Sequence, residues 1–178
     1  MKTKTFGDKK IIIRKLSKND LRNAKKFQEF INSLIEEEAK IMFNKKFSLK
    51  EEKKWIEEKL RKIKSQKTVF LVAEDNDIVV GTTGINLRIG RQSHVGEFGI
   101  TIRKGYRGMG LGIYLMEEII ELAKKELKPK FIRLEVYPNN KPALALYRKF
   151  GFKKVAKIPK QIQYKGKLLD EIVMLKEL

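Results

Sequence analysis

The chain has 178 residues, with 41 Lys and Arg against 22 Asp and Glu, one His and no Cys. Its length suits a single domain, and we expect residues 1–178 to form one. The absence of Cys excludes a disulfide scaffold and thiolate catalysis, and one His is too few for a multi-histidine site, so we expect no metal. The net charge of +19 attracts polyanions such as nucleic acid, anionic membranes or phosphorylated small molecules.

No apolar run approaches the ~18 residues that cross a bilayer. The first ten residues are polar and lack the apolar core of a signal peptide. We therefore expect a cytoplasmic protein without membrane contact.

The N-terminal part of the chain predicts one strand and two helices. Residues 11–14 are β-rich. Asn19-Asp20 predicts a helix cap, because apolar residues then recur at helical spacing at Leu21, Ala24, Phe27, Phe30, Ile31, Leu34 and Ile35. Ser48 with Glu51 forms the capping-box pattern of a second helix. Its apolar stripe contains Trp55, Ile56, Leu60 and Ile63.

The pattern then changes to that of strands. Residues 69–73 form a buried-type strand, and 78–87 form its hairpin partner across the turn 75–77. A second turn at 89–93 leads to a third strand at 95–102.

The C-terminal part alternates helices and strands. A basic, glycine-rich turn at 103–112 precedes a helix that ends before Pro129. A strand at 131–136 and a short helix at 142–150 follow, with Gly151 after the helix end. The chain closes with an antiparallel pair, for which the sequence predicts residues 152–158 and 168–175.

These elements predict an α/β (α+β) fold. Its mixed, mostly antiparallel sheet has about seven strands and is flanked by about four helices.

The turn Arg107-Gly108-Met109-Gly110-Leu111-Gly112 lies between a strand and a helix. Glycines let backbone amides approach a ligand, and a helix N-terminus favours anions, so the pattern is typical of diphosphate binding. It lacks the Lys-Ser/Thr ending of a P-loop and the glycine spacing of a dinucleotide fingerprint. A tight strand-to-helix turn explains these residues equally well.

A second segment favours the ligand-binding interpretation. Leu134-Glu-Val136 is followed by Asn140, Ala143, Leu146-Tyr147 and Gly151-Phe152. With the glycine-rich turn, this segment resembles the GNAT superfamily of N-acetyltransferases, closely over residues 69–158. The resemblance implies a GNAT-type fold and an acyltransferase that uses acetyl-CoA as cosubstrate.

The resemblance also implies roles for individual residues. Acetyl-CoA would contact the strand end Ile100, Thr101 and Ile102, the turn Arg107, Gly108, Met109, Gly110, Leu111 and Gly112, and Asn140 and Tyr147. Tyr147 matches the family's general acid for the leaving thiolate, and a core aromatic is the alternative. Glu97 matches a proposed general base, with His94 or a water as alternatives and a structural carboxylate as the simpler interpretation.

The implied reaction is direct attack of a primary amine on the thioester through a tetrahedral intermediate. The acceptor is expected to be a small molecule more than a protein, and the positive charge disfavours polyamines. Met42, Phe43 and Trp55 would border the amine site or belong to the core. The alternatives are a protein N-terminal or lysine acetyltransferase and a non-catalytic module that binds nucleic acid. Nucleic acid remains a secondary partner, and the chain a monomer or homodimer.

Overall fold

A computed structural model describes residues 1–178 and contains eight strands and four α-helices, with two short 3-10 turns at Lys18–Leu21 and Gly90–Gln92. The strands are β1 (Lys2–Phe6), β2 (Lys9–Lys15), β3 (Thr68–Asp75), β4 (Ile78–Leu87), β5 (Val95–Ile102), β6 (Phe131–Val136), β7 (Lys153–Tyr164) and β8 (Lys167–Glu177). The helices are α1 (Ala24–Glu36), α2 (Leu49–Lys64), α3 (Leu111–Glu126) and α4 (Lys141–Lys149).

The strands are hydrogen-bonded in the order β1-β2-β3-β4-β5-β6-β8-β7. The chain forms two compact units, one of residues Met1–Asn86 with Gly99–Leu127 and one of Leu87–Phe98 with Lys128–Leu178. Strand β5 contributes its first half to the second unit and its second half to the first. The mixed, mostly antiparallel sheet confirms the predicted fold class.

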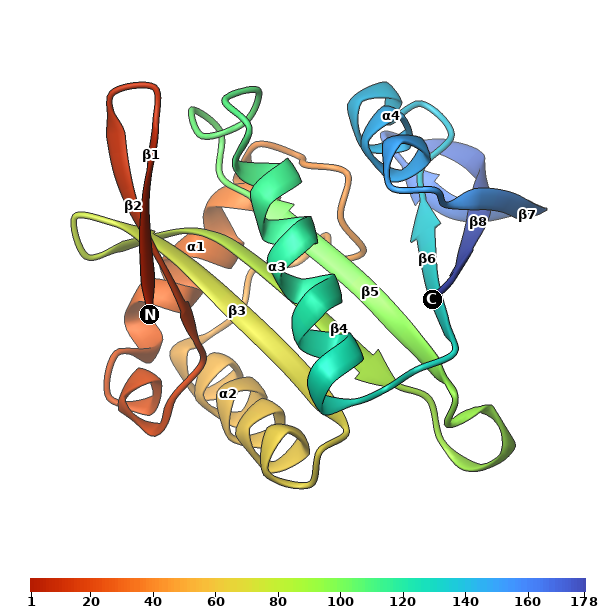
Figure 1. The fold of residues 1–178 in the computed structure, drawn as a ribbon. Coiled ribbons are helices and arrows are strands. Elements are labelled where there is room, and N and C mark those ends of the chain that lie inside the picture. Colours follow the sequence, from red (N-terminus) through yellow and green to blue (C-terminus); the bar gives the residue numbers. More distant parts are fainter. The chain divides into compact units, whose positions relative to one another are not determined.

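The first unit is a sheet covered on both faces. Helix α3 crosses one face of β3 and β4, while α1 and α2 lie on the other (Figure 1). Gly81 of β4 permits the close approach of α3, because a Cβ there would lie 3.3 Å from Cδ1 of Leu115. The even-numbered residues of β4 point the opposite way, toward α1 and α2.

Strand β1 is the strand that the sequence pattern does not predict, and it raises the count from about seven to eight. It pairs with β2 through a turn in which Gly7 has φ +62°. Only Phe6 of β1 is buried. A strand with four exposed residues lacks the apolar alternation that identifies strands in a sequence.

The entry into α1 differs from the predicted cap at Asn19-Asp20. The helix begins at Ala24, and Asn23 occupies the N-cap position without a side-chain cap. Asp20 is 1% exposed and accepts hydrogen bonds from Arg14 of β2, with Nη2–Oδ1 at 2.7 Å and Nη1–Oδ2 at 2.9 Å. Arg14 also donates to Glu74 of β3 through Nε at 2.7 Å and Nη2 at 2.6 Å. One guanidinium thus joins two strands to the turn that leads into α1.

Helix α2 begins as predicted. The Ser48 hydroxyl accepts from the Glu51 amide at 3.3 Å, and the Glu51 carboxylate accepts from the Ser48 amide at 2.7 Å. Ile56 is fully buried, while the other predicted apolar positions of α2 are partly buried against the same core.

The second unit is built on β6. Its residues pair in parallel with β5 over Val95–Glu97 and antiparallel with β8 over the whole of β6. Strands β7 and β8 form the predicted antiparallel pair but extend to Tyr164 and Lys167, where Lys165 and Gly166 adopt positive φ in a tight turn. Gly151 follows α4 with φ +81°, as predicted for a helix end.

None of the four α-helices is long and apolar enough to cross a lipid bilayer.

Candidate active site

The glycine-rich turn at 107–112, between β5 and α3, presents backbone amides on its surface, and we call it the glycine cradle. Gly108 and Gly110 have φ +79° and +93°, a conformation that other residues rarely adopt. Helix α3 begins at Leu111, so it includes the last two residues of the predicted turn at 103–112, and its first backbone hydrogen bond runs from the Tyr114 amide to the Gly110 carbonyl. The amides of Leu111, Gly112 and Ile113 therefore have no acceptor within the protein. Such donors, with the helix dipole, suit a diphosphate.

Two arginines accompany this cradle. Arg107 donates from Nε to the Ile102 carbonyl at 2.7 Å and forms an ion pair with Glu37. Arg103 donates to the Val79 carbonyl at 3.3 Å and lies over the ring of Phe30. The carboxylate of Glu37 partly neutralises the charge of Arg107. The positive charge that Arg107 offers to a ligand is therefore smaller than the sequence suggests.

The end of β5 lies in the first unit and borders a cavity. The ladder between β5 and β6 stops at the pair Glu97–Arg133, so it does not extend to Ile100–Ile102. Thr101 hydrogen-bonds through its hydroxyl to Thr82 at 2.9 Å, and Ile100 and Thr101 line the cavity described below. Ile100 and Thr101 therefore form part of the cavity wall and Ile102 does not, while their contact with acetyl-CoA stays a prediction.

Glu97 lies in the second unit as an exposed carboxylate between two arginines. Its Oε1 is 2.8 Å from Nε of Arg88 and 3.7 Å from Nη1 of Arg133. Two cations therefore lie within ion-pairing distance of this carboxylate. His94 is exposed just after a turn, and its ring packs edge-on against Phe131.

Tyr147 of α4 is 7% exposed and packs against Phe98 and Phe152, with ring centroids 5.9 and 6.1 Å away. Burial raises the pKa of its hydroxyl to about 12. The hydroxyl makes no hydrogen bond within the protein. Every side-chain polar atom that is fully buried does have a partner, so this oxygen is not fully buried. The oxygen must therefore reach the surface of this aromatic cluster. Tyr147 is both a core aromatic and a protonated donor open to a ligand.

Asn140 occupies the N-cap position of α4, but its side chain makes no capping hydrogen bond. Pro142 in the first turn of the helix has no amide hydrogen, which removes one donor that a cap would satisfy. The amide group of Asn140 is left for a ligand.

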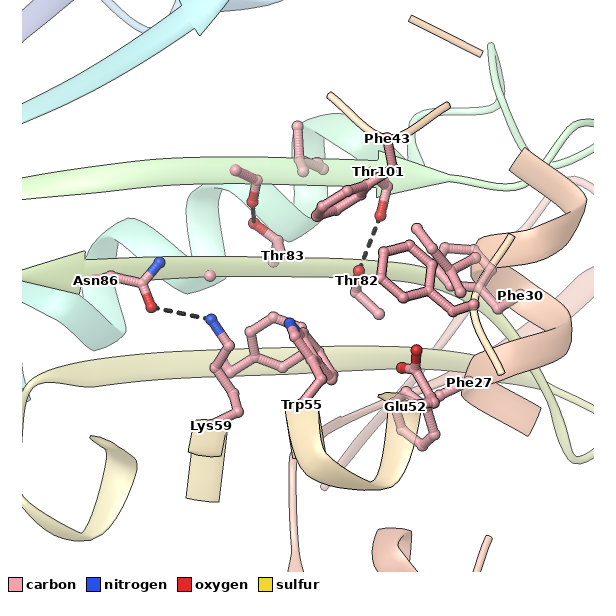
Figure 2. Close-up of a pocket in the computed structure, with 16 residues that line it drawn as sticks. Phe27, Phe30, Phe43, Glu52, Trp55, Lys59, Thr82, Thr83, Asn86 and Thr101 are labelled. Carbon is pink, nitrogen blue, oxygen red and sulfur yellow. Dashed lines mark hydrogen bonds between the residues drawn. The ribbon is translucent and has the colours of Figure 1, made fainter. Parts of the chain in front are cut away.

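A cavity of about 220 Å³ lies wholly within the first unit, between α1, α2 and strands β3–β5. Figure 2 shows the side chains that point into it. Six of the sixteen residues that line it are aromatic, namely Phe27, Phe30, Phe43, Phe47, Trp55 and Phe70. Phe43 is 50% exposed and Met42 69% exposed, so neither belongs to the core, whereas Trp55 lines the cavity as the sequence allows.

The connection between α1 and α2 is held in place beside the cavity. Gln28 and Asn32 of α1 each donate to the Phe47 carbonyl at 3.0 Å, and Asn32 accepts from the Phe47 amide at 2.9 Å. The ring of Phe47 meets that of Phe43 edge-on at 5.0 Å. Side chains of a helix thus fix the backbone from which two of the aromatic rings project.

Two charged residues of α2 line this cavity, and the sequence analysis missed both. Glu52 and Lys59 are surrounded in the sequence by solvent-facing Lys and Glu. Their spacing from Trp55 and Ile56 at three and four residues would place them on the same helix face. That periodicity is the signal that could have identified them.

Glu52 is 6% exposed, and its burial raises the pKa of the carboxyl to about 7. An acid with a raised pKa binds its proton more tightly in the folded state, so stability falls as pH rises from about 4.5 to 7. We expect Glu52→Gln to raise the free energy of unfolding by up to about 3 kcal/mol at pH 8 and to leave it nearly unchanged at pH 4. Urea denaturation at both pH values measures this.

The matched control is Glu57→Gln on the exposed face of α2. A Glu52→Gln variant no more stable than wild type at pH 8 would contradict the unfavourable burial of this carboxylate.

The sequence profile of the acetyltransferase (GNAT) family matches residues 31–152. This match covers more than half of the chain and includes the glycine cradle, Tyr147 and all the cavity-lining residues except Phe27 and Phe30. The chain belongs to the acetyltransferase (GNAT) family.

Two curated relatives share part of the sequence. The L-amino acid N-acetyltransferase AaaT of Escherichia coli is 36% identical over 78 residues, which are 44% of this chain and 48% of that protein. An N-alpha-acetyltransferase of Sulfurisphaera tokodaii is 30% identical over 104 residues, which are 52% of this chain and 61% of that protein. The chain therefore matches about half to three-fifths of the length of these relatives.

Solved structures share the fold over nearly the whole chain. A GNAT-family acetyltransferase from Streptococcus pneumoniae has a TM-score of 0.82 at 24% identity, covering 94% of this chain and 99% of that one. The putative acetyltransferase yncA of Salmonella typhimurium, solved with its cofactor acetyl-CoA, has a TM-score of 0.79 at 21% identity and covers 94% of both chains. At these identities the likeness shows the fold alone.

Proposed function

We propose that the protein is an acetyl-CoA-dependent N-acetyltransferase that acts on small primary amines. The observation that carries this proposal is the aromatic cavity of about 220 Å³ in a chain of the GNAT family. This volume is below the roughly 300–1,000 Å³ common for drug-sized ligands, so the cavity suits a small acceptor.

The residues of the chain fit acetyl-CoA. The unpaired amides of Leu111, Gly112 and Ile113 would hold its diphosphate, with Gly108 and Gly110 shaping the cradle. The backbone of Ile100–Ile102 and the side chain of Asn140 would bind the pantetheine arm. Acetyl-CoA supplies the thioester that the amine attacks.

Side chains of the protein would carry out the two proton transfers of the reaction. An alkylammonium has a pKa near 10.4 and must lose a proton before it can attack, so a general base is needed near the acceptor. The family resemblance implies Glu97, with His94 or a water as alternatives, while Glu52, whose pKa burial raises to about 7, is the only carboxylate in the wall of the cavity. The hydroxyl of Tyr147 stays protonated at neutral pH and can donate its proton to the departing thiolate.

Acetyl-CoA at 100 times its dissociation constant is expected to stabilise the protein by about 2.7 kcal/mol, raising its melting temperature by several degrees. Differential scanning fluorimetry measures the shift. S-acetyl-pantetheine, which lacks the diphosphate, is the matched control and should give a much smaller shift. An unmoved melting temperature with acetyl-CoA would refute the proposal.

A protein N-terminus is the second candidate acceptor, because a relative at 30% identity is described as an N-alpha-acetyltransferase. Thiol release measured with small amines and with short peptides separates the two. Faster turnover of peptides at equal concentration would favour this second candidate.

A further inference from the structure

The carboxyl group of Glu52 lines the aromatic cavity and has no hydrogen-bond or ion-pair partner in the protein. Its oxygens make no hydrogen bond or ion pair within the protein, and no buried side-chain polar atom is unsatisfied. They must therefore face the cavity, whose wall contains no other carboxylate. A carboxylate surrounded by apolar rings is costly, and a ligand cation would remove that cost.

Lys59 is the only other charged residue in the wall. Its Nζ donates to Oδ1 of Asn86 at 3.0 Å and lies 5.4 and 5.5 Å from the rings of Trp55 and Phe70. The same Asn86 oxygen accepts from Thr68 at 2.9 Å, which fixes its direction. No carboxylate lies within ion-pairing distance of Lys59, so the charge of its ammonium remains available to the cavity.

Glu52 and Lys59 do not pair with each other. They are seven residues apart on α2, a rise of about 10 Å. Figure 2 shows them at opposite ends of the cavity with Trp55 between them. The cavity therefore has a negative end, a positive end and aromatic walls along its length.

We propose that the acceptor is a primary amine with one ring-sized apolar group and no second positive charge, whose ammonium binds Glu52 and whose apolar group packs between Trp55 and the phenylalanine rings. This inference rests on the proposed N-acetyltransferase function. The cation satisfies the only carboxylate, and the rings bury the apolar group at roughly 25 cal/mol per Å².

Lys59 gives the cavity its selectivity by charge. A diamine or polyamine that places one ammonium at Glu52 extends its second toward the other end, where Lys59 repels it in a site of low polarity. An amine that ends in an uncharged group meets no such repulsion.

The test compares amines in pairs, by thiol release with acetyl-CoA at saturation. Hexylamine against 1,6-diaminohexane isolates the second charge, and 2-phenylethylamine against ethylamine isolates the ring. We expect kcat/KM at least tenfold higher for the first member of each pair. These ratios use the unmodified protein, so they do not depend on the folding of any variant.

Two variants locate the effect in the cavity. Glu52→Gln is expected to raise KM for 2-phenylethylamine at least tenfold, and Lys59→Met to bring the hexylamine to diaminohexane ratio close to one. Glu57→Gln and Lys53→Met, on the exposed face of the same helix, are the matched controls and should change neither value.

Equal or faster turnover of the diamine, or an unchanged KM in a folded Glu52→Gln variant, would overturn the inference. If acetyl-CoA stabilises the protein but only peptides or polycations are acetylated, the inference fails and the acetyltransferase function stands. If acetyl-CoA neither stabilises the protein nor releases thiol with any amine, the function itself fails, and the inference with it.

Discussion

Replacing Arg14 by methionine is expected to lower the free energy of unfolding by about 4 kcal/mol, because it leaves two carboxylates without their cation. The side chain of Asp20 is 2% exposed and that of Glu74 13% exposed, so water cannot replace the lost hydrogen bonds. The guanidinium also ties the turn before α1 to the sheet, and α1 forms one wall of the aromatic cavity. Urea denaturation at pH 7 measures the loss.

Two further variants test this explanation. Lys10→Met on the same strand has an exposed side chain and should change stability by less than about 0.5 kcal/mol. Adding Asp20→Asn and Glu74→Gln to Arg14→Met removes the unpaired charges and should restore part of the stability. An Arg14→Met variant that loses less than 1 kcal/mol would show that the charge network is not stabilising.

Tyr147→Phe is expected to reduce kcat about 100-fold while KM for acetyl-CoA and the melting temperature stay near wild type. The hydroxyl makes no hydrogen bond in the protein, so its removal leaves the packing against Phe98 and Phe152 intact. Under the proposed mechanism, the variant lacks the proton donor for the leaving thiolate. Steady-state thiol release with a good acceptor amine measures the change.

Tyr114→Phe on α3 removes a tyrosine hydroxyl elsewhere and is the matched control for Tyr147→Phe. A Tyr147→Phe enzyme with kcat within threefold of wild type would refute the proton-donor role. A large fall in melting temperature would instead indicate that Tyr147 acts through packing.

Much of the fold could be predicted because it depends on local patterns. Strands β4, β5 and β6 have the predicted bounds, since each combines β-forming residues with a turn at its ends. The capping box fixes the start of α2 in the same way. The start of α1 was mispredicted because the side chain of Asp20 pairs with Arg14, a contact between positions that only the folded sheet brings together.

The residues of the candidate site also differ in whether local sequence patterns or tertiary contacts place them. The glycine cradle and Tyr147 belong to contiguous motifs, so their positions could be predicted from the sequence. The spacing of Glu52 and Lys59 from Trp55 and Ile56 places them on the apolar face of α2, but a charged residue on a helix normally faces water, so the sequence alone did not identify them. The packing of α2 against α1 and β3 places these side chains at the cavity. The acceptor specificity that we propose therefore depends on tertiary structure.

The sharing of β5 between two units has a consequence for synthesis of the protein. All residues of the first unit have been made once translation passes Leu127. The second unit needs Leu87–Phe98 and must wait for the C-terminal residues 128–178. Domains fold as their residues emerge from the ribosome, so the aromatic cavity can form while the segment carrying Tyr147 is still being translated. Neither unit is a continuous stretch of chain, and no single truncation can isolate the second.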